Sequence, residues 1–488
     1  MTLEYITRSL MRWGWPIVLL LMAVTAAVFL FKPITSIPAM TPKDFNEGYH
    51  AYFAAVAFDP AHLYPGQTSL IENVYTPLHY YLVGLVGAGL GDHIVAGRWV
   101  ALLAFAVTSA LIAATVRRVS GSGRTAVFSA LLFASFIALR HPSYVGMNDP
   151  QWVGQAFAAA GLYAFIRWGA TRAGLLSVAV LVLAAGMAKQ TLIALPLAIT
   201  WCLSVHDRRK ALDWLLYSAL VLAASVGALY AVYGKQFLVG VLWLESDSQI
   251  SWLRVVNNFR TLLEPMAVLL GGLVVFVALE PRGRVKSLVL AYAVAAALVG
   301  FLITGAAGLD WNHLYDLVVA LVVATGLAVH RLGERLAAIW VPRAVEALAA
   351  FFIAVGVFVA VPSKLAEARW TAHELAQREM RAKRDIAYIS EQKGPVLCET
   401  IALCYWGKKP FDADILVIRR KLSTGALPYE EFRSLIDSGY FDALQFHSGG
   451  STGRTKRLPE AANDYILQKY QSRPNEMGGS FLTPRGSQ

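Results

Sequence analysis

Charged residues and cysteines are scarce in this chain of 488 residues. Only 15% of its residues are charged, whereas a soluble globular domain carries about a quarter. Three cysteines are too few for a disulfide-based scaffold. Cys202 lies in an apolar run, where we expect it to pack, whereas Cys398 and Cys404 can pair only in an oxidising compartment. The scarcity of charge excludes an ordinary soluble enzyme.

Long apolar runs take the place of the missing charge. Hydrophobic residues make up 57% of the chain, and its mean hydropathy is +0.51. Spanning a bilayer takes about 20 apolar residues per helix, and about eleven segments meet or approach that length. They lie near residues 13–31, 94–116, 125–139, 151–167, 173–188, 191–205, 211–233, 262–279, 287–305, 314–330 and 342–361. The sequence therefore predicts an all-α polytopic membrane protein.

Two apolar segments need separate interpretations. The run at 78–90 is short and rich in glycine, so we expect it to lie in the membrane interface or to re-enter rather than to span. The first run, at 13–31, is longer than the apolar core of about 7–15 residues in a cleavable signal peptide. We therefore expect a retained signal anchor.

The net charge of +11 is explained by topology rather than by nucleic acid. Lys and Arg collect in cytoplasmic loops of membrane proteins. Alternate loops are rich in such residues, namely Arg8, Arg12, Arg117, Arg118, Arg124, Arg167, Arg172, Arg208, Arg209, Lys210, Arg282, Arg284, Lys286, Arg331, Arg335 and Arg343. This pattern predicts a cytoplasmic N-terminus, an extracytoplasmic C-terminus and no nucleic-acid partner. We expect the protein to lie in a bacterial inner (plasma) membrane.

The chain changes character after the last apolar run. Residues 364–393 are charged with apolar positions at helical spacing, which predicts a helix rising from the membrane. Short strands are expected at 395–400 and 441–446, a helix at 429–437, and either a strand or a helix at 414–422. The end of the chain, from Gly449, is rich in Gly, Ser, Pro and charge, and is expected to be loop or disorder.

The sequence thus predicts two domains. Residues 1–361 form a transmembrane core with a long first outside loop at 32–93, and residues 362–488 form a small α/β extracytoplasmic domain with a flexible end. Ionisable residues inside or beside spans are functional candidates, because lipid cannot satisfy them.

The first outside loop contains Asp44, Asn46, Glu47 and Tyr49 ahead of a stretch with aromatic residues at helical spacing. Asp44 or Asn46 is able to cap that helix. An acid at the membrane surface is equally suited to act as a general base. Both interpretations stay open on the loop alone.

Further candidates enter or precede apolar segments. Tyr75 and His79 lead into the short run at 78–90, next to tyrosines that suit an interfacial aromatic belt. Asn148 and Asp149 stand directly before an expected span. A carboxylate there interacts favourably with the positive end of the helix dipole, so capping and a catalytic or ligand role are both open for Asp149.

Three basic or titratable side chains lie at membrane depth. Lys189, followed by Gln190, sits between two apolar runs with almost no loop around it. A lysine there snorkels, pairs or binds an anion, and we favour anion binding. Arg98, inside the second apolar run, is interpreted in the same way. His313 has an acid on each side at a membrane face.

The order of these motifs resembles the GT-C superfamily of membrane glycosyltransferases, which includes protein O-mannosyltransferases and aminoarabinose transferase. The shared features are an N-terminal anchor, an acidic pair before an aromatic helix, a Tyr-Thr-Pro-Leu motif at 75–78, Asn148-Asp149-Pro150, and Lys189-Gln190. Phrases of the tail, including residues 394–397, 406–408 and 439–442, resemble the soluble domains that follow many such cores. The resemblance covers most of the chain.

This resemblance implies an inverting glycosyltransferase. Its donor would be a sugar on a polyprenyl phosphate, and its acceptor the hydroxyl of a glycan, lipid or protein. The family commonly has Asp-Glu where this chain has Asn46-Glu47, so Glu47 or Asp44 would serve as the base. Lys189, Gln190, Arg98 and His313 would hold the donor phosphate.

The resemblance also assigns the remaining candidates. Asn46, Tyr49, Tyr75, His79 and Asn148 would line the substrate site, with Asp149 as a further catalytic carboxylate. No metal is required, although Glu47, Asp149 and His313 would form a divalent metal site if they converge.

Two other functions compete with this one. A transporter or flippase of a lipid-linked substrate would perform no chemistry, but such proteins often contain internal repeats, and none is evident here. An O-antigen polymerase or ligase would be expected to place its long functional loop later in the chain.

Overall fold

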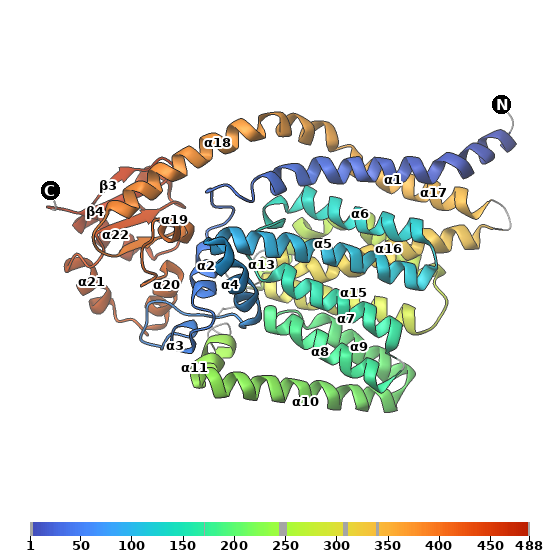
Figure 1. Ribbon diagram of the computed structural model, residues 1–488, viewed down its shortest axis with the longest axis horizontal. Helices are drawn as coiled ribbons and strands as arrows, with labels where there is room; N and C mark the ends of the chain where they lie inside the picture. The colour runs from blue at the N-terminus through green and yellow to red at the C-terminus, as the bar shows by residue number, and fades with distance from the viewer. Residues whose placement is uncertain (1–2, 170, 244–250, 306–310, 338–340, 487–488) are drawn as a thin grey trace.

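The computed structural model describes residues 3–169, 171–243, 251–305, 311–337 and 341–486. A bundle of helices runs along the long axis, and a small domain with a sheet caps one end (Figure 1). The bundle contains α1 (Leu3–Thr35), α5 (His93–Ser120), α6 (Gly123–Arg140), α7 (Gln151–Trp168), α8 (Arg172–Ala188), α9 (Ala194–His206), α10 (Arg208–Tyr233), α13 (Trp252–Leu263), α14 (Ala267–Leu279), α15 (Arg284–Thr304), α16 (Tyr315–Arg335) and α17 (Pro342–Phe358).

All eleven predicted apolar segments coincide with helices of this bundle. Within the described residues, seven helices are long and apolar enough to cross a membrane, or eight if the bent pair α17 and α18 counts as one span. Helices α8 and α9 are apolar but shorter. The chain is a multi-pass membrane protein, and the predicted number of eleven spans is not confirmed.

The bundle is organised around α16. Its residues from Tyr315 to Val329 are buried throughout, so neighbouring helices surround it on every side. Small residues let these helices approach, as Gly326 does against Ser129 of α6. Helix α10 is the opposite case, because none of its most apolar stretch is buried in the protein. An apolar helix with a bare surface faces lipid.

The first loop and the C-terminal domain lie together at the same end of the bundle, opposite the N-terminus (Figure 1). We call this end the loop end. The loop forms α2 (Glu47–Ala55), α3 (Pro60–Leu63) and α4 (Leu78–Leu90). Helix α4 has 13 residues, too few to span, which agrees with the interfacial or re-entrant prediction. Further short turns are η1 (Pro142–Tyr144), α11 (Lys235–Leu238), η2 (Val239–Trp243), η3 (Glu264–Met266) and η4 (Trp311–Leu314).

Helix α18 (Val361–Glu391) leaves the bundle at an angle of 44° to α17 and carries the chain to the C-terminal domain. Pro362 stands in its first turn, where the missing N–H of proline costs nothing. The prediction of a charged helix after the last apolar run is confirmed.

The C-terminal domain packs helices on a four-stranded sheet with strand order β1-β2-β4-β3. Strands β1 (Val396–Cys398) and β2 (Ala443–Phe446) are parallel, and β4 (Ser480–Pro484) pairs antiparallel with β2 and with β3 (Tyr470–Pro474). Its other elements are α19 (Ile401–Trp406), α20 (Ile415–Thr424), α21 (Tyr429–Asp437), η5 (Gly450–Thr452) and α22 (Glu460–Lys469).

The predicted α/β character is confirmed, and the segment at 414–422 is a helix. The prediction of loop or disorder from Gly449 onward is wrong, because α22 and the β3–β4 hairpin form there. Ile466, Tyr470 and Leu482 belong to the buried core of the domain and order this segment. Cys398 and Cys404 form a disulfide, and Cys202 is a buried free thiol.

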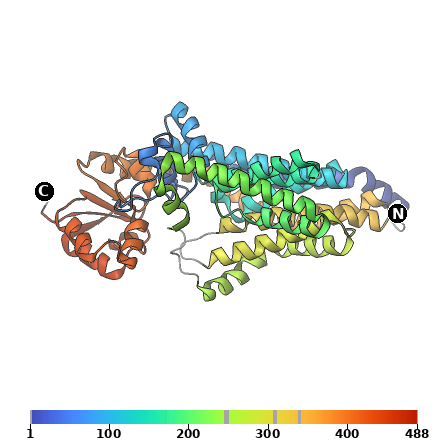
Figure 2. The same cartoon turned by 90° about the horizontal axis from the view of Figure 1, so that it is seen from below.

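The C-terminal domain contacts the first loop directly, as the second view also shows (Figure 2). Helix α19 packs on α2, where Gly48 leaves no room for a side chain against the backbone of Ile401 and Ala402. Tyr52 donates a hydrogen bond to the carbonyl of Lys409 (2.6 Å), and Trp406 donates to Asp92 (2.9 Å). These contacts fix the position of the first loop.

Candidate active site

Asp149 and Lys189 form an ion pair at the loop end of the bundle. Asp149 precedes α7, and its Oδ1 accepts a hydrogen bond from the backbone N–H of Gln151 (2.8 Å). Lys189 ends α8, and its Nζ lies 3.6 Å from Asp149 Oδ1. The two residues are only 6% and 3% exposed, so this ion pair is largely shielded from water. Shielding strengthens charge interactions there relative to water.

The break between α8 and α9 is attached to the segment that leads into α4. Gln190 donates from Nε2 to the carbonyl of Val74 (2.7 Å), and Thr76 donates to the carbonyl of Gly186 (3.0 Å). The ring of Tyr75 lies 6.0 Å from Lys189 Nζ. These bonds explain why Lys189 turns inward rather than snorkelling to the membrane surface.

Three histidines surround the ion pair. His50 Nε2 lies 3.9 Å from Asp149 Oδ2, and His79 Nε2 lies 3.2 Å from Asn148 Oδ1. His313 is close enough to interact electrostatically with both Asp149 and Lys189. We call Asp149, Lys189 and these three histidines the polar centre.

The histidines of the polar centre offer unused ring nitrogens. Among the described residues, His50 Nε2, His79 Nδ1 and His313 Nδ1 are buried without a hydrogen-bond partner. Each such buried group costs about 1–3 kcal/mol, a cost that a polar ligand would remove. Burial lowers the pKa of His50 to about 3 and that of His79 to about 4. Both rings are therefore neutral near pH 7.

Asp149 is held in its charged form. Burial alone would raise its pKa, but Lys189 and the hydrogen bond from Gln151 together lower it below the usual value for aspartate. An ionised carboxylate near a cation and neutral imidazoles is able both to accept a proton and to orient a donor.

Glu47 and Arg98 form a second buried pair with a different character. Arg98 donates from Nε to Glu47 Oε1 (2.8 Å) and from Nη2 to Oε2 (2.6 Å). Its other three N–H groups donate to backbone carbonyls at residues 37, 39 and 41. All five donors of the guanidinium are used, so Arg98 has none left for a phosphate.

Glu47 is equally occupied. Besides the two bonds from Arg98, Oε2 accepts from the backbone N–H of Lys43 (2.8 Å) and Oε1 from that of Asn148 (3.2 Å). Burial would raise the pKa of Glu47, but Arg98 and these hydrogen bonds hold it below its usual value. In this geometry protein groups engage both side chains, which argues against the predictions of Glu47 as base and Arg98 as phosphate ligand.

The remaining first-loop candidates lie around α2. Asn46 is the N-cap residue of that helix but makes no capping bond with its side chain, and Asp44 Oδ1 accepts from the N–H of Asn46 (2.9 Å). Tyr49 donates to the carbonyl of Glu72 (2.9 Å), and its ring packs against His50 and Tyr75. Tyr49 therefore packs beside the polar centre through its contact with His50.

Asn148 links the two buried pairs. Its backbone N–H donates to Glu47, its side chain contacts His79, and the next residue is Asp149. Among the described residues, no group of three His, Cys, Asp or Glu side chains has the arrangement needed to hold a metal ion. Glu47, engaged by Arg98, does not join Asp149 and His313 in such a group.

Sequence reasoning did not select His50 as a site residue. The signal available in the sequence was its position directly after Tyr49, in the first-loop stretch that already holds several candidates.

Comparisons with known proteins show which proteins the chain is similar to. The family described as dolichyl-phosphate-mannose-protein mannosyltransferase matches residues 74–233, a segment that contains Asp149 and Lys189. No curated protein matches the chain.

Several solved structures share the whole fold. ArnT from Cupriavidus metallidurans in the apo state is 14% identical, with a TM-score of 0.64 over 96% of this chain and 97% of that one. The same protein bound to undecaprenyl phosphate is 13% identical, with a TM-score of 0.61 over 97% and 99%. The oligosaccharyltransferase AglB from Archaeoglobus fulgidus, in complex with an inhibitory peptide and a dolichol-phosphate, is 11% identical, with a TM-score of 0.52 over 97% and 74%.

These matches define the fold of the protein. The chain has the fold of the GT-C superfamily of membrane glycosyltransferases, as the order of its motifs predicts. The description of the matching family names dolichyl-phosphate-mannose, and two of the similar structures contain undecaprenyl phosphate or a dolichol-phosphate.

Proposed function

We propose that this protein is an inverting glycosyltransferase that moves a sugar from a polyprenyl-phosphate donor to an acceptor hydroxyl at the outer face of the membrane. The observation that carries the proposal is the buried Lys189–Asp149 ion pair, with a distance of 3.6 Å between Nζ and Oδ1. Support also comes from the similar structures, one bound to undecaprenyl phosphate and one to a dolichol-phosphate.

Lys189 would bind the donor phosphate. The leaving group of the reaction is a lipid phosphate that is already anionic, so it needs a positive charge more than a proton. Lys189 is the cation of the polar centre, and burial strengthens its attraction for an anion. Gln190 holds the segment of Val74 in place, while His79 and His313 offer ring nitrogens to the phosphate or sugar.

Asp149 would be the general base. Its Oδ2 faces His50 rather than Lys189, so one oxygen stays available to an acceptor hydroxyl. When the donor phosphate takes over Lys189, Asp149 loses part of the positive field that lowers its pKa. Donor binding would thereby make Asp149 a stronger base at the moment when it is needed.

The direction of attack sets the stereochemistry. The acceptor oxygen, deprotonated by Asp149, would attack the anomeric carbon as its bond to the phosphate oxygen breaks, and the electron pair of that bond leaves with the phosphate. Attack opposite the leaving group inverts the anomeric configuration. The sugar would lie between Asp149 and Lys189, replacing their direct contact.

The setting of the reaction follows from the topology. We place the loop end at the extracytoplasmic face of a bacterial plasma membrane, because the basic residues of the sequence gather in the opposite loops. A disulfide in the C-terminal domain suits an oxidising compartment. The acceptor is a glycan, lipid or protein, and no resident metal takes part in this scheme.

The test is a transfer assay with purified full-length protein in lipid nanodiscs. A panel of labelled polyprenyl-phosphate sugars is incubated with membrane extract, and both labelled product and released polyprenyl phosphate are measured. We expect one donor to yield both in equal amounts, with inverted linkage in the product. If no donor in the panel is consumed, or if the retained linkage forms, the proposal is wrong.

A further inference from the structure

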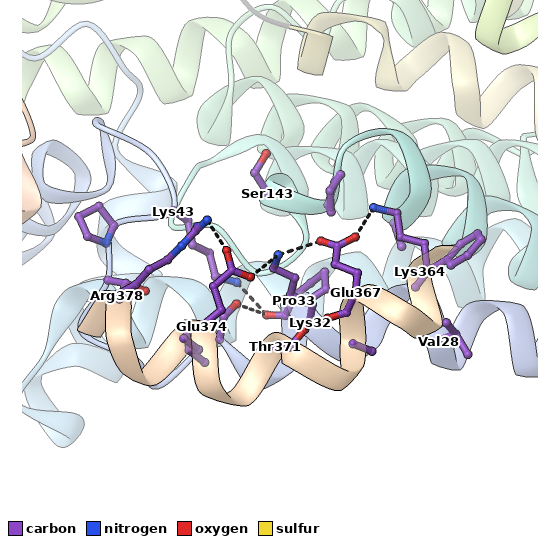
Figure 3. Close-up of a pocket in the computed structure, with 18 of the residues that line it drawn as sticks. Val28, Lys32, Pro33, Lys43, Ser143, Lys364, Glu367, Thr371, Glu374 and Arg378 are labelled. Atoms are coloured by element: carbon purple, nitrogen blue, oxygen red, sulfur yellow. Dashed lines mark hydrogen bonds and ion pairs between the residues drawn. The ribbon is translucent and has the colours of Figure 1, made fainter. Parts of the chain in front are cut away.

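A cavity of about 610 Å³ lies between the C-terminal end of α1, α18 and the C-terminal domain (Figure 3). The start of the first loop also lines it. We call it the side cavity. Five basic side chains line it, namely Lys32, Lys43, Lys364, Arg378 and Arg381, against only two carboxylates, Glu367 and Glu374. Its lining therefore holds three more basic than acidic side chains.

Part of this charge holds the two helices together. Lys32 of α1 lies 2.8 Å from Glu367 and 3.6 Å from Glu374, both on α18. Lys364 and Arg378 complete a row of ion pairs along α18, at 2.8 Å from Glu367 and 2.5 Å from Glu374. The carboxylates are thus fully engaged, as the dashed lines of Figure 3 show.

Lys43 and Arg381 remain outside this row and form no ion pair among the described residues. Lys43 donates from Nζ to the carbonyls of Pro33 (2.8 Å) and Val145 (3.2 Å), which leaves its third N–H without an acceptor among the described residues. Burial and the nearby Arg98 lower the pKa of Lys43 to about 7. A bound anion would reverse this effect and stabilise the ammonium form.

The side cavity is apolar on the side of the bundle. Val28 and Phe29 of α1 and Ala138 of α6 line it, and both helices are candidate spans. A site that joins apolar walls at the end of two spans to a cluster of cations is matched to an amphiphile with an anionic head.

We propose that the side cavity binds the phosphate headgroup of an anionic lipid, at a site separate from the polar centre. The two sites are divided by the Glu47–Arg98 pair. Thr41 and Lys43 line the cavity, while their backbone carbonyl and N–H bond to Arg98 and Glu47. On the other side of the pair, Glu47 accepts from the N–H of Asn148. This inference does not rest on the proposed function.

The test measures lipid binding directly, without any transfer reaction. Full-length protein in a neutral detergent is titrated with short-chain phosphatidylglycerol, short-chain phosphatidylcholine or inorganic phosphate, and heat release is recorded. We expect phosphatidylglycerol to bind tightest of the three. The double variant Lys43→Gln/Arg381→Gln removes the two cations that lie outside the ion-pair row, and should weaken its binding at least about 10-fold, because two charge-assisted contacts are lost.

Two controls make the result specific. Arg369→Gln removes a charge from an exposed position of the same helix outside the cavity, and should leave the affinity unchanged. Lys189→Met should also leave it unchanged, which separates this site from the polar centre. Equal affinity for the two phospholipids, or unchanged phosphatidylglycerol binding in the double variant, overturns the proposal. Inorganic phosphate bound as tightly as phosphatidylglycerol overturns the lipid assignment.

Discussion

Lys189 Nζ lies 3.6 Å from Asp149 Oδ1, although α7 and the whole of α8 separate the two residues in the chain. In a buried ion pair of this kind, removing one partner leaves the other charged, buried and without a counter-ion. A substitution of either residue should therefore change a measurable property of the other.

The first prediction concerns donor binding. Lys189→Met keeps the apolar stem and deletes the charge, so the affinity for a polyprenyl phosphate should fall at least about 10-fold, the loss expected for one charge-assisted contact. Lys189→Arg keeps a positive charge and should retain part of the affinity. Binding of fluorescent polyprenyl phosphate to purified protein measures both. Unchanged affinity in Lys189→Met would remove this residue from the donor site.

The second prediction concerns pH. Lys189 helps to lower the pKa of Asp149. A base with a lowered pKa stays ionised to lower pH, so the loss of kcat/KM on acidification should occur below the usual pKa of aspartate, about 3.9. In Lys189→Met that pKa rises, and activity should be lost at higher pH than in wild type. A profile of kcat/KM against pH decides this, with Lys189→Arg as the matched control; coincident acid limbs in Met and Arg variants would contradict it.

The third prediction separates structure from chemistry at Glu47. Glu47→Gln breaks a fully buried pair with Arg98, a change that typically costs about 3–5 kcal/mol of stability. Thermal unfolding should show a large loss, whereas Glu430→Gln at an exposed position should show none. The pKa of Glu47 is lowered by folding, so its contribution is present above the unfolded pKa of about 4.3 and is lost as the pH falls through the folded value.

The activity of Glu47→Gln carries the second half of that test. Turnover per folded molecule should stay within about 10-fold of wild type if Glu47 only positions the first loop and Asn148. A loss of about 10²-fold or more in protein that stays folded would return the base to Glu47, as the sequence alone predicts.

The fourth prediction concerns the contact between α2 and α19. A Cβ at Gly48 would collide with the backbone of Ile401 and Ala402. Gly48→Ala should therefore displace the C-terminal domain from the first loop, lowering both the unfolding temperature and the rate of transfer. Gly89→Ala is the matched control, because open space surrounds that glycine on α4. Equal behaviour of the two variants would show that close packing of α19 on α2 is dispensable.

Local sequence patterns were sufficient for the helices but not for the whole fold. Every predicted apolar segment is a helix. Such helices can be predicted because the signal is the hydropathy of consecutive residues in one window of sequence. The number of spans depends on depth and tilt, which packing sets. The end of the C-terminal domain was missed because its buried residues, such as Ile466 and Leu482, are few and lie on different elements. Only the assembled sheet brings them together.

The same limit applies to the site. Lys189 and Asp149 are recognisable in the sequence as ionisable groups beside apolar runs, and both lie in the polar centre. Arg98 met the same criterion and Glu47 was selected in the first loop, yet these two residues are 51 residues apart in the chain and satisfy each other. No spacing rule reveals that pairing. A buried charged side chain needs a partner of opposite charge. Only the structure shows whether that partner is another residue or a ligand.

The fifth prediction tests the role of Asp149 as base. Asp149→Asn keeps the size of the side chain and its position before α7, and an asparagine oxygen is still able to accept the hydrogen bond from Gln151. The change removes the proton acceptor and leaves Lys189 without its counter-ion. Donor binding should therefore be maintained or strengthened while the chemical step is lost.

Single-turnover transfer from a labelled polyprenyl-phosphate sugar, with the donor bound to saturation, measures that step most directly. The rate for Asp149→Asn should fall at least about 10²-fold below wild type, with donor affinity equal or higher. A rate within a few-fold of wild type at saturating donor would contradict the assignment of the base, and with it the proposal that the Lys189–Asp149 pair carries out the transfer.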